Sequence, residues 1–251
     1  MPQPQHARQP RTSPSSAGRE TASALEDAAW RLATGRAGAV VGTRAVLAAD
    51  PRHVRAHALV GAARWLDGDL VGAVESLSLA ARTAARVPRR RDRQLVEVVC
   101  AVAGGTADRA GLVAREHAAD FPDDIVVCLL LGRAAEIEGD DRVWSTVEGL
   151  LRAAAPYVAA SSSPRLVGAH AGLAALAAAG RGRPDAASLA LAALELDPGS
   201  GTAMHALVHA LESRGEADVA HGVAARWTAE HHPAPWLRDH LTTHGVVAAA
   251  G

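Results

Sequence analysis

Histidines form the group of side chains in this sequence whose types and spacing could support chemistry. His205 and His209 are separated by one helical turn, and Glu212 follows close behind them. Each residue turns an α-helix by about 100°, so these three side chains share one helical face. Two further histidines, His240 and His244, are one turn apart near the end of the chain. Imidazoles at this spacing can bind one metal ion together.

A metal-dependent enzyme is one function that this pattern predicts. The site would form if the last predicted helix packed against the face that carries the first pair. The nitrogen ligands of a divalent transition metal would then be His205, His209, His240 and His244. Glu212 would be a further ligand or would accept a hydrogen bond from a coordinated ring. The HExxH motif of zinc proteases is absent, because no glutamate follows either histidine of the first pair.

A polar binding groove is the other interpretation of the same residues, and it is the leading one. In that case no cofactor is needed, and the side chains contact a peptide, a protein partner or a small ligand. The candidate groove residues are His170, His205, His209 and Glu212. Whether the protein is an enzyme stays open at this stage.

Helical repeats are the elements that must position these side chains. In the best copy, a glycine, a second glycine, an alanine, a large apolar residue and a last alanine follow at the spacing of a tetratricopeptide repeat. They are Gly61, Gly68, Ala73, Leu77 and Ala80. The small residues let two helices approach closely, and Gly68 suits the turn between them.

The repeat period predicts an all-α fold, a right-handed α-solenoid of about six tetratricopeptide-like hairpins. The hairpins are expected at 20–53, 54–87, 88–124, 125–158, 165–200 and 201–234. A capping helix should start at Pro235, and the first helix of each hairpin should line the concave face. Residues 20–251 are then one repeat domain. Residues 1–19 are rich in Pro, Ser, Gln and Arg, and this composition predicts a disordered tail.

The arrangement of these repeats resembles the tetratricopeptide-repeat protein 38-like family. The resemblance rests on Arg91 to Asp124, on Pro122 to Asp140 (PDDIVVCLLLGRAAEIEGD) and on His170 to Arg181. Its most specific part is MHALVHALESRG from Met204, and LRDHLTTH from Leu237 corresponds to the histidine-rich terminal helix of that family. The resemblance implies a fold and a histidine-containing helix, and it names no reaction.

Composition excludes several other classes of function. The formal net charge is -1, so nothing global draws the chain to nucleic acid or to an anionic membrane. Five arginines lie between Arg86 and Arg93, but no aromatic residue is interleaved to stack on bases. The sequence shows neither a signal peptide nor a long apolar run, and Cys100 and Cys128 share no metal or redox spacing. We therefore predict a cytoplasmic protein that binds neither nucleic acid nor membrane. The absence of lysine and asparagine is typical of a GC-rich bacterial genome.

Overall fold

Helices account for the regular structure of the described residues. The computed structural model describes residues 16–86 and 89–247, and this part of the chain contains no β-sheet. The helices are α1 (Ser16–Ala33), α2 (Ala39–Ala49), α3 (Val54–Leu66), α4 (Leu70–Ala84), α5 (Arg90–Ala103), α6 (Ala107–Asp120), α7 (Val126–Glu138), α8 (Asp141–Ala160), α9 (Pro164–Gly180), α10 (Ala186–Leu196), α11 (Gly201–Glu212), α12 (Ala217–Glu230) and α13 (Pro235–Val247). Within this part of the chain, none of these helices has the length and apolar character needed to cross a bilayer.

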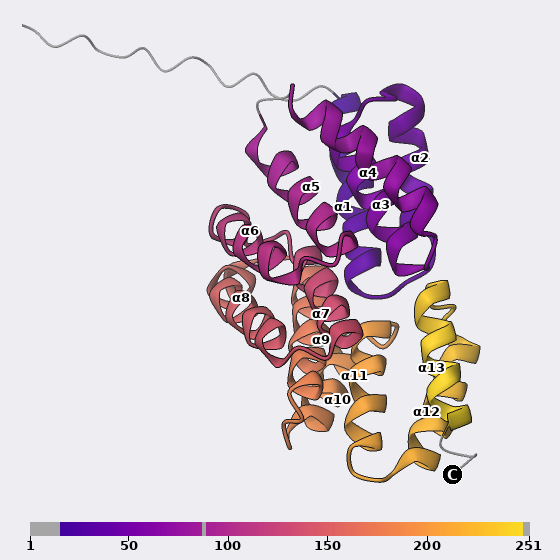
Figure 1. Ribbon diagram of the computed structural model, residues 1–251. Helices are drawn as coiled ribbons and strands as arrows, with labels where there is room; N and C mark the ends of the chain where they lie inside the picture. Colours follow the sequence, from indigo (N-terminus) through magenta and orange to yellow (C-terminus); the bar gives the residue numbers. More distant parts are fainter. Residues whose placement is uncertain (1–15, 87–88, 248–251) are drawn as a thin grey trace, which may run out of the picture.

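Successive helices pair into six hairpins, from α1 and α2 to α11 and α12, and α13 follows the last pair (Figure 1). This confirms the predicted all-α solenoid of hairpins with a C-terminal capping helix. Two boundaries differ from expectation. Helix α1 begins at Ser16, within the predicted tail, whose residues 1–15 lie outside the described part. Helix α8 contains Pro156 and continues to Ala160, beyond the predicted end of its hairpin.

A glycine in the left-handed region marks the turn inside every hairpin. These residues are Gly35 and Gly38, Gly68, Gly105, Gly139, Gly182 and Gly215. Their φ angles are positive, which costs other residues free energy, and this explains why glycine recurs at the repeat period. The local turn chemistry therefore marks where each hairpin reverses direction.

Gly180, the last residue of α9, leaves room for Trp144 of α8. A Cβ atom at this position would overlap the Trp144 indole, which is rigid and only 4% exposed. We expect Gly180→Ala to lower the free energy of unfolding by about 1–3 kcal/mol, as overpacked cores do. Urea denaturation measures this. Gly149→Ala is the matched control, because its Cβ would meet nothing within 4 Å. Equal effects of the two substitutions would contradict the prediction.

The N-terminal hairpin lies against the C-terminal part of the solenoid. Helix α1 contacts α3, α7 and α9, and it buries Leu25, Ala28 and Leu32. In Figure 1 the indigo segment after α1 comes down beside the yellow α13. Helix α1 therefore packs on the first helices of two later hairpins, α7 and α9, as well as on its neighbours in the chain. Its apolar side is buried there rather than in the neighbouring hairpin alone.

Backbone hydrogen bonds fasten the α1–α2 turn to this distant partner. Gly201 N donates to Thr34 O at 2.8 Å, and Ala234 N donates to Gly35 O at 2.9 Å. Thr202 Oγ1 donates to Ala33 O at 2.8 Å. Trp236 N also donates to Asp67 Oδ1 at 3.2 Å, between α13 and the α3–α4 turn. The first two hairpins and the last helices thus close the array on itself.

Candidate functional sites

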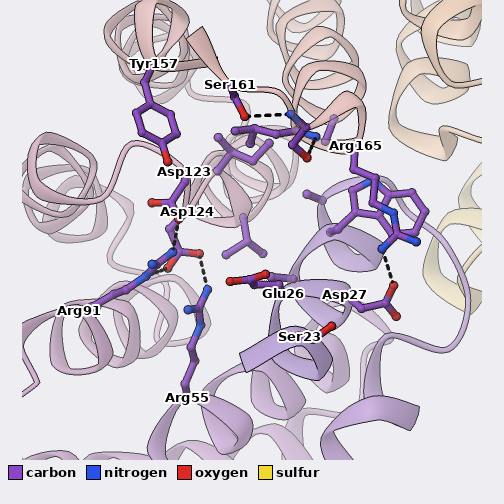
Figure 2. A pocket seen from close by; sticks show the side chains of 18 residues that line it. Ser23, Glu26, Asp27, Arg55, Arg91, Asp123, Asp124, Tyr157, Ser161 and Arg165 are labelled. Atoms are coloured by element: carbon purple, nitrogen blue, oxygen red, sulfur yellow. Dashed lines mark hydrogen bonds and ion pairs between the residues drawn. The ribbon is translucent and has the colours of Figure 1, made fainter. Parts of the chain in front are cut away.

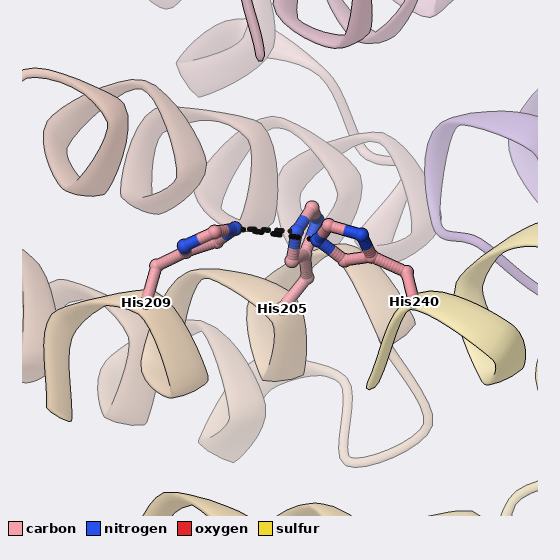
Figure 3. A group of neighbouring side chains, drawn as sticks. All are labelled: His205, His209 and His240. Carbon is pink, nitrogen blue, oxygen red and sulfur yellow. Dashed lines mark hydrogen bonds between the residues drawn. The ribbon is translucent and has the colours of Figure 1, made fainter. Parts of the chain in front are cut away.

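Three histidines from two helices meet inside the closed array. His205 and His209 project from α11, and His240 projects from α13 (Figure 3). We call these three residues the histidine cluster. The Nε2 atoms of His205 and His209 are 2.8 Å apart, and those of His209 and His240 are 3.4 Å apart. One potential ligand atom from each residue lies within 4.8 Å of the others, so the three could hold one metal ion.

The three members of the histidine cluster differ in their exposure to solvent. His205 is fully buried, whereas His209 and His240 are partly exposed. The His205 ring meets the edges or faces of three neighbours, with centroids 4.6 Å from His209, 4.4 Å from His240 and 6.3 Å from Trp236. Access from solvent is therefore through His209 and His240.

Glu136 of α7 completes the surroundings of the histidine cluster. Its Oε1 lies 3.4 Å from His205 Nε2 and 3.9 Å from His209 Nε2. Its Oε2 accepts a hydrogen bond from Arg133 Nη1 at 2.8 Å. Burial raises the pKa of Glu136 to about 7, and the hydrogen bond and charge of Arg133 oppose that rise only in part. The carboxylate thus lies where an additional positive charge would stabilise it.

The other predicted site residues take different places. Glu212 Oε2 lies 3.9 Å from His209 Nδ1. The other ring nitrogen of His209, Nε2, is the one that faces His205 and His240. His170 lies outside the group that could share an ion, and its Nε2 donates to Leu151 O at 2.9 Å. His244 belongs to α13, but its side chain lies outside the described residues. The structure therefore brings His205, His209 and His240 together, with Glu212 beside them.

A second candidate site is a cavity of about 300 Å³ that we call the inner pocket. It lies where the N-terminal ends of α3, α5, α7 and α9 face α1 (Figure 2). Its polar and aromatic lining includes Glu26, Asp27, Trp30, Arg55, Arg91, Asp123, Asp124, Tyr157, Ser161, Ser163 and Arg165. Both signs of charge are present, and Tyr157 is 47% exposed. This lining offers donors, acceptors and aromatic surface in one place.

A buried ion-pair network forms the floor of the inner pocket. Asp124 Oδ1 lies 3.2 Å from Arg55 Nη2, and its Oδ2 accepts from Arg91 Nε at 3.0 Å. His117 Nε2 is 3.3 Å from the same Oδ2. Burial alone would raise the pKa of Asp124, but His117, Arg55 and Arg91 together hold it well below its usual value. Asp124 therefore stays ionised and fixes both arginines.

The rim of the inner pocket is more accessible. Arg165 donates to Asp27 Oδ1 at 3.0 Å and holds its guanidinium 4.5 Å from the centre of the Trp30 ring. The Arg165 side chain is 61% exposed. A neighbouring cavity of about 420 Å³ shares Glu26, Arg55 and Arg91 with the inner pocket and adds Arg89 and Arg90. Part of the arginine run between Arg86 and Arg93 thus lines a cavity.

Sequence analysis did not identify Glu136 or the inner pocket, because both carry only weak signals in the sequence. Arg133 and Glu136 interrupt the apolar run of α7 at a spacing of three, which marks a polar stripe on an inner helix. That signal could have pointed to Glu136, although not to its partner. The inner pocket draws on α1, α3, α5, the start of α7 and the α8–α9 segment, and no local motif unites them.

Comparisons with known proteins add a fold-level likeness. No protein-family model matches the sequence, and no curated protein matches it. The crystal structure of yeast Tom70 is similar over 84% of this chain and 43% of the Tom70 chain, with 14% sequence identity and a TM-score of 0.49. This chain therefore spans less than half of that structure. The fold assignment rests on the helices of the chain itself, and the resemblance to the tetratricopeptide-repeat protein 38-like family stays a prediction.

Proposed function

We propose that this protein is a helical-repeat scaffold that binds a peptide segment of a protein partner at the inner pocket. The observation that carries this proposal is the composition of that pocket. Tryptophan, tyrosine and arginine dominate binding energy at protein interfaces, and Trp30, Tyr157 and Arg165 occur together at its rim. The mixed charges of the lining suit a peptide, whose backbone offers both donors and acceptors.

The scaffold is preorganised for such a contact. Asp124, which lies just before α7, anchors Arg55 of α3 and Arg91 of α5. Binding to a fixed surface loses less conformational entropy than binding to a mobile one. The proposal rests on the inner pocket and does not include a metal-dependent enzyme at the histidine cluster.

Photo-crosslinking tests where the partner binds. A photoreactive phenylalanine analogue is placed at Tyr157 in the inner pocket and, as a control, at Val219, which is 52% exposed on α12. We expect a protein that is cross-linked only from Tyr157. The same products from both positions would contradict the proposal.

Affinity for the partner identified in this way gives the quantitative test. Arg165→Glu reverses an exposed charge beside Trp30, so we expect the Kd for the purified partner to rise about 10- to 30-fold. The matched control is Arg226→Glu, an exposed arginine of α12. Calorimetry measures both values. An unchanged Kd for Arg165→Glu, or an equal loss in the control, would overturn the proposal.

A further inference from the structure

We propose that the histidine cluster and Glu136 form a zinc site in which three imidazole nitrogens and one carboxylate oxygen are the ligands. The proposed ligand atoms are Nε2 of His205, His209 and His240 and Oε1 of Glu136. This site lies apart from the inner pocket and does not depend on the proposed scaffold function. Its occupant would be an intrinsic metal ion, not a substrate.

The distances within this group match a tetrahedral site. With zinc–nitrogen bonds of about 2.0–2.1 Å, ligand atoms around a tetrahedral ion lie roughly 3.3 Å apart. Two of the three Nε2–Nε2 distances in the histidine cluster are 2.8 Å (His205–His209) and 3.4 Å (His209–His240), and one ligand nitrogen of each histidine lies within 4.8 Å of the others. Glu136 Oε1 is 3.4 Å from His205 Nε2 and 3.9 Å from His209 Nε2. Small side-chain rotations therefore suffice to admit an ion among the four groups.

The ligand types select among metals. Imidazole suits zinc and other late transition ions, whereas magnesium and calcium prefer oxygen ligands alone. Two of the histidines come from one face of α11, and the other two ligands approach from α7 and α13. Ligands that arrive from different directions favour a tetrahedral ion over the square-planar geometry of Cu²⁺.

The surroundings of these ligands also fit a bound cation. Arg133 holds Glu136 Oε2 and leaves Oε1 directed toward the histidines. Glu212 Oε2 lies near His209 Nδ1, where a carboxylate can orient a coordinated imidazole. The Glu136 side chain is only 13% exposed, and a divalent ion would compensate its buried negative charge.

Such an ion would join three helices that are distant in the sequence. Glu136 belongs to α7, the first two histidines belong to α11, and His240 belongs to α13. Zinc would thus hold the capping helix against the inside of the solenoid, in addition to the apolar contacts of Trp236 and Leu237. Binding free energy at such a site adds to the stability of the folded chain.

Metal titration of the full chain, purified without a histidine tag and stripped with a chelator, tests the proposal. We expect one equivalent of Zn²⁺ to bind and to raise the Tm. Co²⁺ should replace it and give the intense visible bands of a tetrahedral site. His240→Gln should weaken zinc binding more than about 100-fold, because it removes a ligand and not merely an outer partner. Glu136→Gln, which also replaces a proposed ligand, should weaken zinc binding to a similar extent.

His221→Ala is the matched control, because His221 is an exposed histidine of α12. Its zinc affinity should equal that of the parent chain. Zinc that binds equally to the parent and to both ligand variants would be adventitious and would overturn the proposal. A Co²⁺ spectrum of the octahedral type in the parent chain would also overturn the proposal. The absence of stoichiometric zinc binding would overturn it as well. The Co²⁺ spectrum of the parent decides the outcome even if a variant fails to fold.

Discussion

Asp124→Asn is expected to lower the free energy of unfolding by about 3–5 kcal/mol, the usual cost of removing one partner from a buried ion pair. The Asp124 side chain is 1% exposed and lies against Arg55, Arg91 and His117. Asparagine keeps the shape but leaves Arg55, whose side chain is only 12% exposed, without its counter-charge. Urea denaturation at neutral pH measures the difference. The neighbouring Asp123→Asn is the control, because Asp123 is 36% exposed, and it should cost about 1 kcal/mol or less.

The pH dependence of this effect has a definite sign. The pKa of Asp124 is lowered in the folded state, so the unfolded chain takes up a proton near pH 4 while the folded chain does not. The stabilisation by Asp124 is therefore fully present above about pH 4 and is lost as the pH falls further. The difference in the free energy of unfolding between the parent and Asp124→Asn should therefore become smaller below pH 4. An equal difference at pH 3 and pH 7 would contradict this account.

Leu237→Ala is expected to destabilise the chain by about 2–5 kcal/mol. Leu237 of α13 is fully buried, and its side chain fills the space beside Gly35 and Gly201. These two glycines belong to the α1–α2 turn and to the start of α11, so Leu237 occupies the point where the array closes. Its truncation leaves a cavity that three segments cannot fill without moving together.

Val219→Ala provides the comparison for this substitution. Val219 is 52% exposed on α12, and its truncation should change the free energy of unfolding by no more than about 0.5 kcal/mol. Hydrogen exchange should also show faster exchange at both Thr202 and Ala234 in Leu237→Ala, because both backbone amides donate to the α1–α2 turn. A loss below 1 kcal/mol would mean that closure contributes little to stability.

The hairpins could be predicted because their signals are local. Turn glycines and apolar residues three and four apart recur with each repeat, so the expected hairpin at 54–87 matches α3 and α4 closely. The predicted hairpin at 125–158 stops before the end of α8, which runs through Pro156 to Ala160. A proline usually ends a helix, but α8 buries Val158 beyond it, and that burial favours continuing the helix.

Closure of the array could not be predicted from the repeats. It depends on the carbonyl groups of Ala33, Thr34 and Gly35, which carry no side-chain signature. The histidine cluster and Glu136 likewise include one part that the sequence predicts and one that it does not. The pair on α11 was visible as a helical stripe, whereas the approach of Glu136 depends on how the hairpins curve. Curvature accumulates from small rotations between neighbouring hairpins, and a repeat pattern does not specify them.

The closed array has a consequence for how the protein is synthesised. Ala33 and Thr202 form a hydrogen bond across 169 residues of sequence. At about 5–20 residues per second, a ribosome needs roughly 10–30 s to make the segment between them. During that time the nascent α1 cannot yet bury its apolar side against α9, nor can the turn after it meet α11. Helix α1 thus leaves the ribosome well before α7 and α9, and the part of its apolar side that packs on them stays uncovered until they follow.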